Sequence, residues 1–138
     1  MVIDHIGVVV RSLEDGIQQW ERSFGYTRRS DIVLNAREQV RVVFLAKEGS
    51  VIVKLVEPVG AESPVFAFAR RGGGLHHLCF RCENIDAGVS KLKDEGALCL
   101  KPPEPGEAFN NNKIAFLLIK NNLNIELVDS AEKTGWSE

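Results

Sequence analysis

The stretch HIGVVVRSLEDGIQQW, residues 5–20, falls on HLCFRCENIDAGVSKL, residues 77–92, when the sequence is shifted by 72 positions. At the same offset VVFLAKEGSVIVKLVEP, residues 42–58, falls on IAFLLIKNNLNIELVDS, residues 114–130. Apolar positions coincide through both blocks, and a histidine begins each copy of the first block. A single offset that aligns two separate blocks without a gap indicates an internal repeat. The sequence therefore predicts two copies of one structural module.

The repeat also sets the expected boundaries of the modules. We place the first module at residues 1–70, the second at 74–130 and a polar, loosely held tail at 131–138, all within one domain of residues 1–138. The chain has 138 residues, of which 44% are hydrophobic and 26% are charged. This composition is ordinary for one globular domain with a buried core.

Each module carries the pattern of one strand, one helix and three further strands. Ser12 and Asn84 are placed to cap the two helices, whose apolar residues recur at helical spacing. The expected strands are 2–10, 28–34, 39–46 and 51–57 in the first module, and 75–82, 97–101, 113–119 and 123–129 in the second. The predicted fold class is α+β, with two tandem βαβββ modules that form a curled mixed sheet.

Two connecting segments have patterns of their own. Between the modules, SPVFAFARRGGG predicts a short helix with Ser63 as its cap and Pro64 at its first position. The proline-rich residues 102–107 are expected to form a loop.

The overall charge and the termini exclude several classes of protein. The net charge is −2 and the isoelectric point is about 5.9, so no basic surface predicts binding to nucleic acid or to an anionic membrane. No apolar run approaches the roughly 18 residues that span a bilayer. The N-terminus enters a strand pattern directly and has no secretory signal, so we expect a cytoplasmic protein. Three cysteines are too few for a disulfide framework.

Four polar residues occupy positions that the repeat relates. His5 corresponds to His77 on the first strand of each module, and Lys54 corresponds to Glu126 on the last strand. A pseudo-twofold axis relates such positions in a duplicated fold, so the four side chains are expected to converge around it. Alternation along a strand would send His76 to the face opposite His77. Two imidazoles and a carboxylate suit Zn²⁺, Fe²⁺, Mn²⁺, Co²⁺ or Ni²⁺.

Segments spread over residues 3–130 resemble one known family. They are DHIGVVVRSLEDGI, VRVVFL, LVEPVGAESPVFAF, GGGLHHLCFRCENIDAGVSKLKDEG, KIAFL and IELVD. With them the chain resembles the vicinal oxygen chelate superfamily, which includes glyoxalase I, extradiol dioxygenases and the bleomycin and fosfomycin resistance proteins. It is most similar to the methylmalonyl-CoA epimerase branch. The resemblance implies paired βαβββ modules around a central metal or ligand cavity, and a homodimer.

The resemblance also implies roles for individual residues. A glutamate that precedes a strand of the first module acts as a base in the family, and the matching stretch NAREQVRVVF offers Glu38, with Arg37 as the alternative. Glu126 would be the second carboxylate near the substrate. The residues implied as ligands of a divalent metal are His5, His77, Glu126 and the residue at position 54.

Lys54 departs from the family pattern, which has Gln or Glu at this position. A protonated lysine has three donors and no lone pair, so three interpretations remain open. In the first, the triad His5–His77–Glu126 still holds a metal, as in the Fe²⁺-dependent extradiol dioxygenases. In the second, Lys54 replaces the metal and pairs with Glu126. In the third, the cavity only binds a small molecule, as drug-sequestering members of the superfamily do. A fourth interpretation places Lys54 on an exposed strand face.

The predicted function is that of an isomerase or lyase similar to glyoxalase or methylmalonyl-CoA epimerase. Such an enzyme transfers a proton next to the carbonyl of a small acid or thioester, while a divalent metal or Lys54 stabilises the enolate. Glu126, Lys54 and Glu38 are the predicted catalytic residues. Arg81, on the strand face of His77, is a candidate contact for an anionic substrate group.

Overall fold

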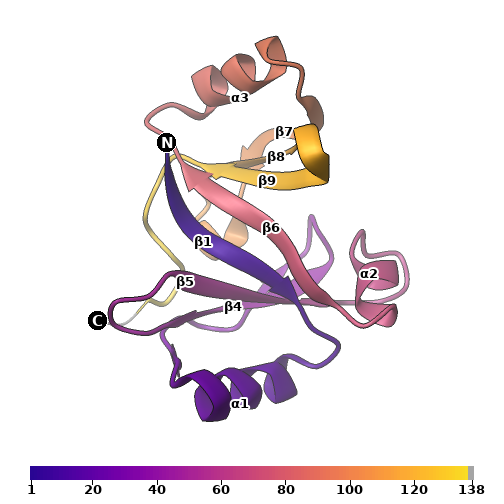
Figure 1. Ribbon diagram of the computed structural model, residues 1–138, viewed down its shortest axis with the longest axis vertical. Coiled ribbons are helices and arrows are strands. Elements are labelled where there is room, and N and C mark those ends of the chain that lie inside the picture. Colours follow the sequence, from indigo (N-terminus) through magenta and orange to yellow (C-terminus); the bar gives the residue numbers. More distant parts are fainter. Residues whose placement is uncertain (137–138) are drawn as a thin grey trace.

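The computed structural model describes residues 1–136, which form a curved sheet with its two longer helices on the outer side (Figure 1). The elements are β1 (Val2–Val9), α1 (Leu13–Phe24), β2 (Thr27–Arg28), β3 (Val33–Asn35), β4 (Val40–Ala46), β5 (Ile52–Pro58), α2 (Phe66–Arg70), β6 (Gly74–Arg81), α3 (Ile85–Asp94), β7 (Leu98–Pro105), β8 (Lys113–Ile119) and β9 (Leu123–Val128). Two short 3-10 turns, Glu107–Phe109 and Lys120–Asn122, flank β8. Helices α1 and α3 lie at opposite ends of the molecule.

The strands of the described residues join in one nine-stranded sheet. Its order is β2-β4-β5-β1-β6-β9-β8-β7, and β3 pairs with β4. Within the modules, β1 pairs in parallel with β5, and β6 pairs in parallel with β9. The two modules meet at the centre, where β1 and β6 are antiparallel. The predicted α+β class and curled mixed sheet are confirmed, and the four central strands carry the residues that the repeat relates.

Side chains at the ends of the helices satisfy backbone groups that would otherwise lack partners. The Ser12 hydroxyl accepts a hydrogen bond from the Asp15 amide, and the Asn84 side chain accepts one from the Ala87 amide. Helix α1 packs on β4 and β5, whereas α3 packs on β7, β8 and β9. Each helix thus covers the strands of its own module, which leaves the concave side of the sheet for the site.

Two connecting segments differ from the prediction. Helix α2 begins at Phe66 rather than at Pro64. In the turn that precedes it, the Ser63 hydroxyl accepts a hydrogen bond from the Val65 amide and the Ser63 carbonyl accepts one from the Phe66 amide. Strand β7 continues through the proline-rich residues that were expected to form a loop. It is the edge strand of the sheet, and an edge strand tolerates prolines because one of its sides needs no N–H donors.

The expected loose tail is ordered as far as residue 136. The Asp31 amide donates a hydrogen bond to the Thr134 carbonyl, and Lys133 is buried. The C-terminal segment therefore returns to the first module. The rest of the predicted tail, residues 137–138, lies outside the described residues.

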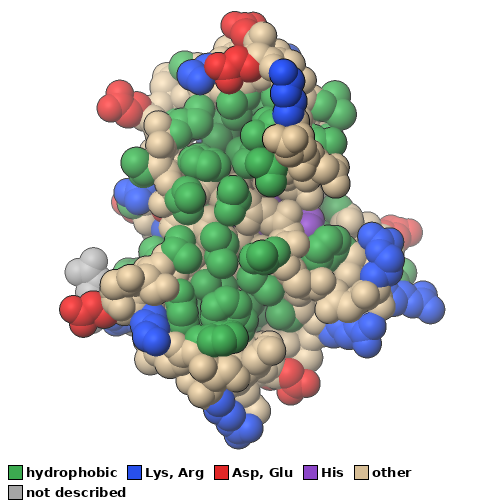
Figure 2. Space-filling model, in the orientation of Figure 1, with side chains coloured by type: hydrophobic (Ala, Val, Ile, Leu, Met, Phe, Trp, Pro, Cys, Tyr) green, Lys and Arg blue, Asp and Glu red, His purple; other side chains and the backbone are tan. Residues whose placement is uncertain are grey.

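One face of the molecule is strongly apolar. Figure 2 shows hydrophobic side chains gathered over the face along which β1 and β6 run, between α1 and α3. Ile6, Val8, Val10 and Leu75 line an open groove there, and Leu75 is 72% exposed. No helix among residues 1–136 has the length and apolar character that crossing a membrane requires.

Candidate active site

Glu126 lies at the centre of a buried polar cluster built from the four central strands. Its Oε1 atom lies 3.0 Å from His5 Nε2 on β1 and 3.1 Å from His77 Nε2 on β6. Its Oε2 atom lies 3.4 Å from Lys54 Nζ on β5. The structure thus brings together the four residues that the repeat relates. Lys54 and His77 line an adjacent cavity, whereas His5 and Glu126 lie beneath it, fully buried.

The Lys54 ammonium lies inside the molecule. Only 5% of its side chain is exposed, so the interpretation as an exposed strand-face lysine is wrong. Its Nζ atom lies within 3.5 Å of both Glu126 oxygens and 5.2 Å from the centre of the Phe109 ring. Burial alone would raise the pKa of Glu126, but the Lys54 ammonium and the imidazoles of His5 and His77 outweigh it. They hold that pKa well below its usual range.

His77 presents a neutral imidazole to the cavity. Burial lowers the pKa of His77 to about 4, despite the nearby Glu126 carboxylate, so the ring is uncharged near neutral pH. Its Nδ1 atom lies 2.9 Å from His76 Nδ1, and one of the two rings donates to the other. Within residues 1–136, Nε2 is buried without a hydrogen bond, since its 3.1 Å approach to Glu126 lacks the required geometry.

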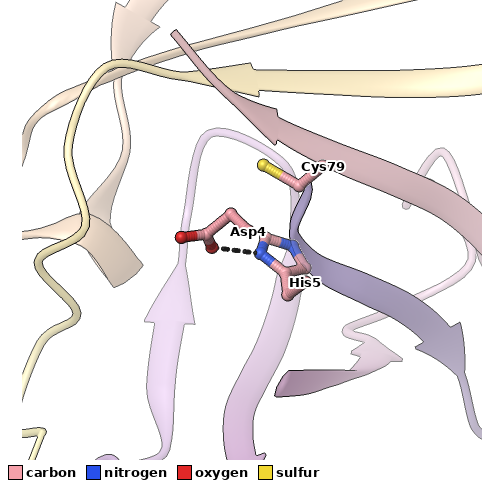
Figure 3. Close-up of side chains that lie close together, drawn as sticks. All are labelled: Asp4, His5 and Cys79. Atoms are coloured by element: carbon pink, nitrogen blue, oxygen red, sulfur yellow. Dashed lines mark hydrogen bonds and ion pairs between the residues drawn. The ribbon is translucent and has the colours of Figure 1, made fainter. Parts of the chain in front are cut away.

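Asp4 and His76 occupy equivalent positions of the repeat, and each bonds the histidine that follows it. Asp4 Oδ2 lies 2.7 Å from His5 Nδ1 (Figure 3), as His76 Nδ1 contacts His77 Nδ1. The pairing of β1 with β6 skips one residue at Asp4 and one at His76. At such a bulge the extra residue does not follow the regular alternation of the strand, so its side chain lies on the same side as that of the following histidine. The prediction that His76 points to the face opposite His77 is therefore wrong, and His76 also lines the cavity.

Lys133 reaches the cluster from the C-terminal segment. Its Nζ atom lies 3.0 Å from Asp4 Oδ1 and 3.1 Å from the Ala131 carbonyl oxygen, and 3% of its side chain is exposed. Burial acts to raise the pKa of Asp4, but the hydrogen bond from His5 and the Lys133 ammonium lower it on balance.

Two further groups lie beside Asp4. The Cys79 thiol is close to Asp4 and His5 (Figure 3), and burial raises its pKa well above the usual value. Arg81 Nε lies 3.5 Å from Asp4 Oδ1, and its side chain does not line the cavity next to Lys54. The expected contact between Arg81 and a substrate in this cavity must be corrected, because its guanidinium turns to Asp4.

The cavity beside Lys54 has a volume of about 340 Å³. Glu38 contributes a carboxylate to its wall, and Lys101 Nζ lies 3.0 Å from Glu38 Oε1. Arg37 is outside this wall, half exposed and 3.9 Å from Glu107, so Glu38 occupies the cavity position. The lining residues are Asn35, Glu38, Val40, Lys54, Val56, Pro64, Val65, His76, His77, Leu100, Lys101, Phe116, Leu117, Asn124 and Ile125.

Three residues of the cluster could share a metal ion, and one opposes it. The ligand atoms of His5, His77 and Glu126 lie within 4.8 Å of one another. Lys54 offers no lone pair, and its ammonium already contacts both oxygens of Glu126. Its positive charge would also repel a divalent ion bound at the same carboxylate. The residues present therefore do not fit the four-ligand divalent metal site that the resemblance implies.

Comparison with known proteins identifies the family. A sequence model of the Glyoxalase/Bleomycin resistance protein/Dioxygenase superfamily matches residues 4–116. The chain belongs to this superfamily. It is similar to the uncharacterized protein YqjC of Bacillus subtilis (strain 168), with 33% identity over 116 residues, which are 83% of this chain and 81% of YqjC.

Epimerases of this superfamily are similar to the chain in sequence and in structure. The ethylmalonyl-CoA/methylmalonyl-CoA epimerase of Cereibacter sphaeroides is 28% identical over 120 residues, which are 83% of this chain and 86% of that enzyme. A solved methylmalonyl-CoA epimerase in complex with methylmalonyl-CoA and NH4+ has a TM-score of 0.79 and 27% identity, over 96% of this chain and 97% of that chain. This member of the superfamily is therefore methylmalonyl-CoA epimerase-like.

Sequence reasoning missed Asp4, Lys101 and Lys133. For Asp4 a signal existed, because the repeat relates it to His76, and both precede a histidine of the cluster. Lys101 and Lys133 lie outside the two aligned blocks, so the repeat gives no information about them.

Proposed function

We propose that this chain is an epimerase-like isomerase that exchanges a proton at the carbon next to the carbonyl of an acyl thioester. The observation that carries the proposal is that one cavity holds both an ammonium, Lys54, and a carboxylate, Glu38. This chemistry needs a base for the proton and a cation for the oxygen of the enolate. Because the similar epimerases are named for methylmalonyl-CoA, we infer a CoA thioester of a small branched acid as substrate.

In the proposed step, Glu38 accepts the proton as the C–H bond breaks and its electron pair passes into the enolate. The N–H groups of Lys54 donate to the carbonyl oxygen, which becomes the enolate oxygen, and Glu126 holds Lys54 in place. A proton from solvent then adds to the opposite face of the carbon, and Glu38 releases its own proton to solvent, which completes epimerisation.

The role of Glu126 as a second base stays a prediction. Its carboxylate has no exposed surface, so it does not meet a substrate directly. His77 lines the cavity and lies 3.1 Å from Glu126 Oε1, but no hydrogen bond joins the two groups.

The test is the incorporation of solvent deuterium into methylmalonyl-CoA and a set of related acyl thioesters in D₂O, followed by mass spectrometry. We expect wild-type protein to label at least one thioester, and Lys54→Met and Glu38→Gln to slow labelling by about a hundredfold or more. Lys91→Met is the matched control, because Lys91 pairs with Glu95 on the exposed side of α3, and its labelling rate should stay unchanged. Wild-type protein that labels none of these thioesters overturns the proposal.

We propose that the chain forms the homodimer implied by the resemblance. The apolar face over β1 and β6 supports this proposal, because such a face is stabilised when it is covered. Sedimentation equilibrium of the wild type and of Leu75→Lys tests it: we expect a dimer that the substitution weakens, and a wild-type monomer contradicts it.

A further inference from the structure

Five side chains form a continuous series of contacts from the C-terminal segment to the cavity. Their order is Lys133, Asp4, His5, Glu126 and Lys54, and the successive contacts measure 3.0, 2.7, 3.0 and 3.4 Å. All five are buried. An ammonium stands at each end, a carboxylate follows each ammonium, and an imidazole joins the two carboxylates. We call these five residues the ammonium–carboxylate series.

The charges of this series balance without any ion from solution. A buried charge is tolerated when an opposite charge is paired with it. Lys133 pairs with Asp4, and Lys54 pairs with Glu126, so each carboxylate has its own cation. A divalent ion bound to Glu126 would add two positive charges beside a carboxylate that the Lys54 ammonium already neutralises.

His5 lies between the two carboxylates of the series. Its Nδ1 atom faces Asp4 Oδ2 and its Nε2 atom faces Glu126 Oε1. The imidazole therefore links the two ion pairs, and both carboxylates are already engaged by contacts within the series.

We propose that Lys54 and Lys133 together take the place of a divalent cation, and that this site works without a bound metal. Lys54 supplies the positive charge next to the cavity. Lys133 neutralises Asp4, which would otherwise strengthen His5 as a metal ligand through its Nδ1 atom. The catalytic part of the inference rests on the proposed function, whereas its metal-binding part rests on the ammonium–carboxylate series alone.

The test measures Co²⁺ binding. Protein is purified without chelator, equilibrated with excess Co²⁺, desalted, and analysed by plasma mass spectrometry and by the visible absorption of bound Co²⁺. We expect almost no Co²⁺ in the wild type. We expect Lys54→Gln to bind Co²⁺ at least about a hundredfold more tightly, because it removes the adjacent positive charge and adds an oxygen donor. Lys54→Glu is the second variant, for use if Lys54→Gln does not fold.

Lys101→Gln is the matched control. It removes an ammonium from the wall of the same cavity, but Lys101 pairs with Glu38 and not with Glu126. Its Co²⁺ binding should equal that of the wild type. The double variant Lys54→Gln/Lys133→Gln should bind more tightly than Lys54→Gln, because Asp4 then lacks its cation.

Stoichiometric Co²⁺ in the wild type overturns the inference. An equal gain in Lys101→Gln also overturns it, as does the absence of any gain in folded variants of position 54. Deuterium exchange in the presence of a chelator tests the catalytic part, and a wild-type rate that requires added metal contradicts it. Absence of exchange with every thioester, with or without metal, counts against the proposed function and leaves the Co²⁺ result to decide the metal-binding part.

Discussion

Lys54 and Glu126 form a buried ion pair in which each charge depends on the other. The Lys54 side chain is 5% exposed and that of Glu126 is 0% exposed, so water cannot solvate either charge if its partner is removed. Removal of one partner of a buried pair costs about 3–5 kcal/mol, whereas replacement of both partners is often neutral. Single and double substitutions should therefore have very different effects on stability.

We expect Glu126→Gln to lower the free energy of unfolding by about 3–5 kcal/mol, because the Lys54 ammonium loses its counter-charge. The double variant Lys54→Met/Glu126→Gln should recover most of this loss. Urea unfolding followed by circular dichroism measures both. Glu95→Gln breaks the exposed Lys91–Glu95 pair and should cost less than about 1 kcal/mol. Equal losses in the single and double variants would show that the ion pair is not the cause.

At the scale of elements, β1 leaves room for a side chain of β6. Gly7 on β1 pairs with His77 on β6. A Cβ atom at position 7 would overlap the His77 imidazole ring. The glycine thus provides the space in which that ring lies beside Glu126 and the cavity.

We expect Gly7→Ala to lower the free energy of unfolding by about 1–3 kcal/mol and to slow deuterium exchange, because the added methyl group displaces His77. Gly16→Ala on α1 is the control. Its methyl group meets the Val10 side chain at 3.1 Å, and a gain in helix propensity of about 1 kcal/mol offsets this contact. Urea unfolding and the labelling assay measure the two effects. Wild-type stability and labelling in Gly7→Ala would contradict the prediction.

The paired bulges of β1 and β6 mark the limit of what strand patterns could predict. Regular alternation separates adjacent side chains, so the strand pattern predicts His76 and His77 on opposite faces. A bulge arises from how two strands pair, and a hydrophobic pattern within one strand does not record it. The same reason explains why Asp4 was not connected with His5.

For the whole molecule, the repeat predicted most of the architecture. Equivalent strands pair in equivalent ways, and His5, Lys54, His77 and Glu126 meet because the four central strands carry them. Lys133 lies beyond the aligned blocks, and its position depends on how the C-terminal segment packs on the first module. The polar composition of residues 131–138 predicts a solvated tail, but a lysine can be buried stably when it pairs with a buried carboxylate, as Lys133 does with Asp4.

The buried groups also determine how stability depends on pH. His77 has a pKa of about 4 in the folded protein and 6.5 as its ordinary value, so the unfolded chain binds a proton that the folded protein excludes. This part of the stability is complete above pH 6.5 and is lost as the pH falls toward 4, by about 3 kcal/mol in all. Below that range, protonation of the Glu126 and Asp4 carboxylates lowers the stability further, because the pKa values of both groups are lower in the folded state than their ordinary values.

Urea unfolding at several pH values between 7.5 and 4.5 measures this dependence. We expect the wild type to lose stability steadily below pH 6.5, and His77→Gln to lose much less over the same interval. A flat wild-type profile, or a profile that His77→Gln leaves unchanged, would assign the effect to other groups.

The contact between Asp4 and Lys133 has a consequence for biosynthesis. The two residues are 129 positions apart, so the ribosome makes Asp4 early and Lys133 almost at the end of this sequence. Until residue 133 has emerged, Asp4 lacks its cation. The finished site is therefore assembled only after translation has passed residue 133.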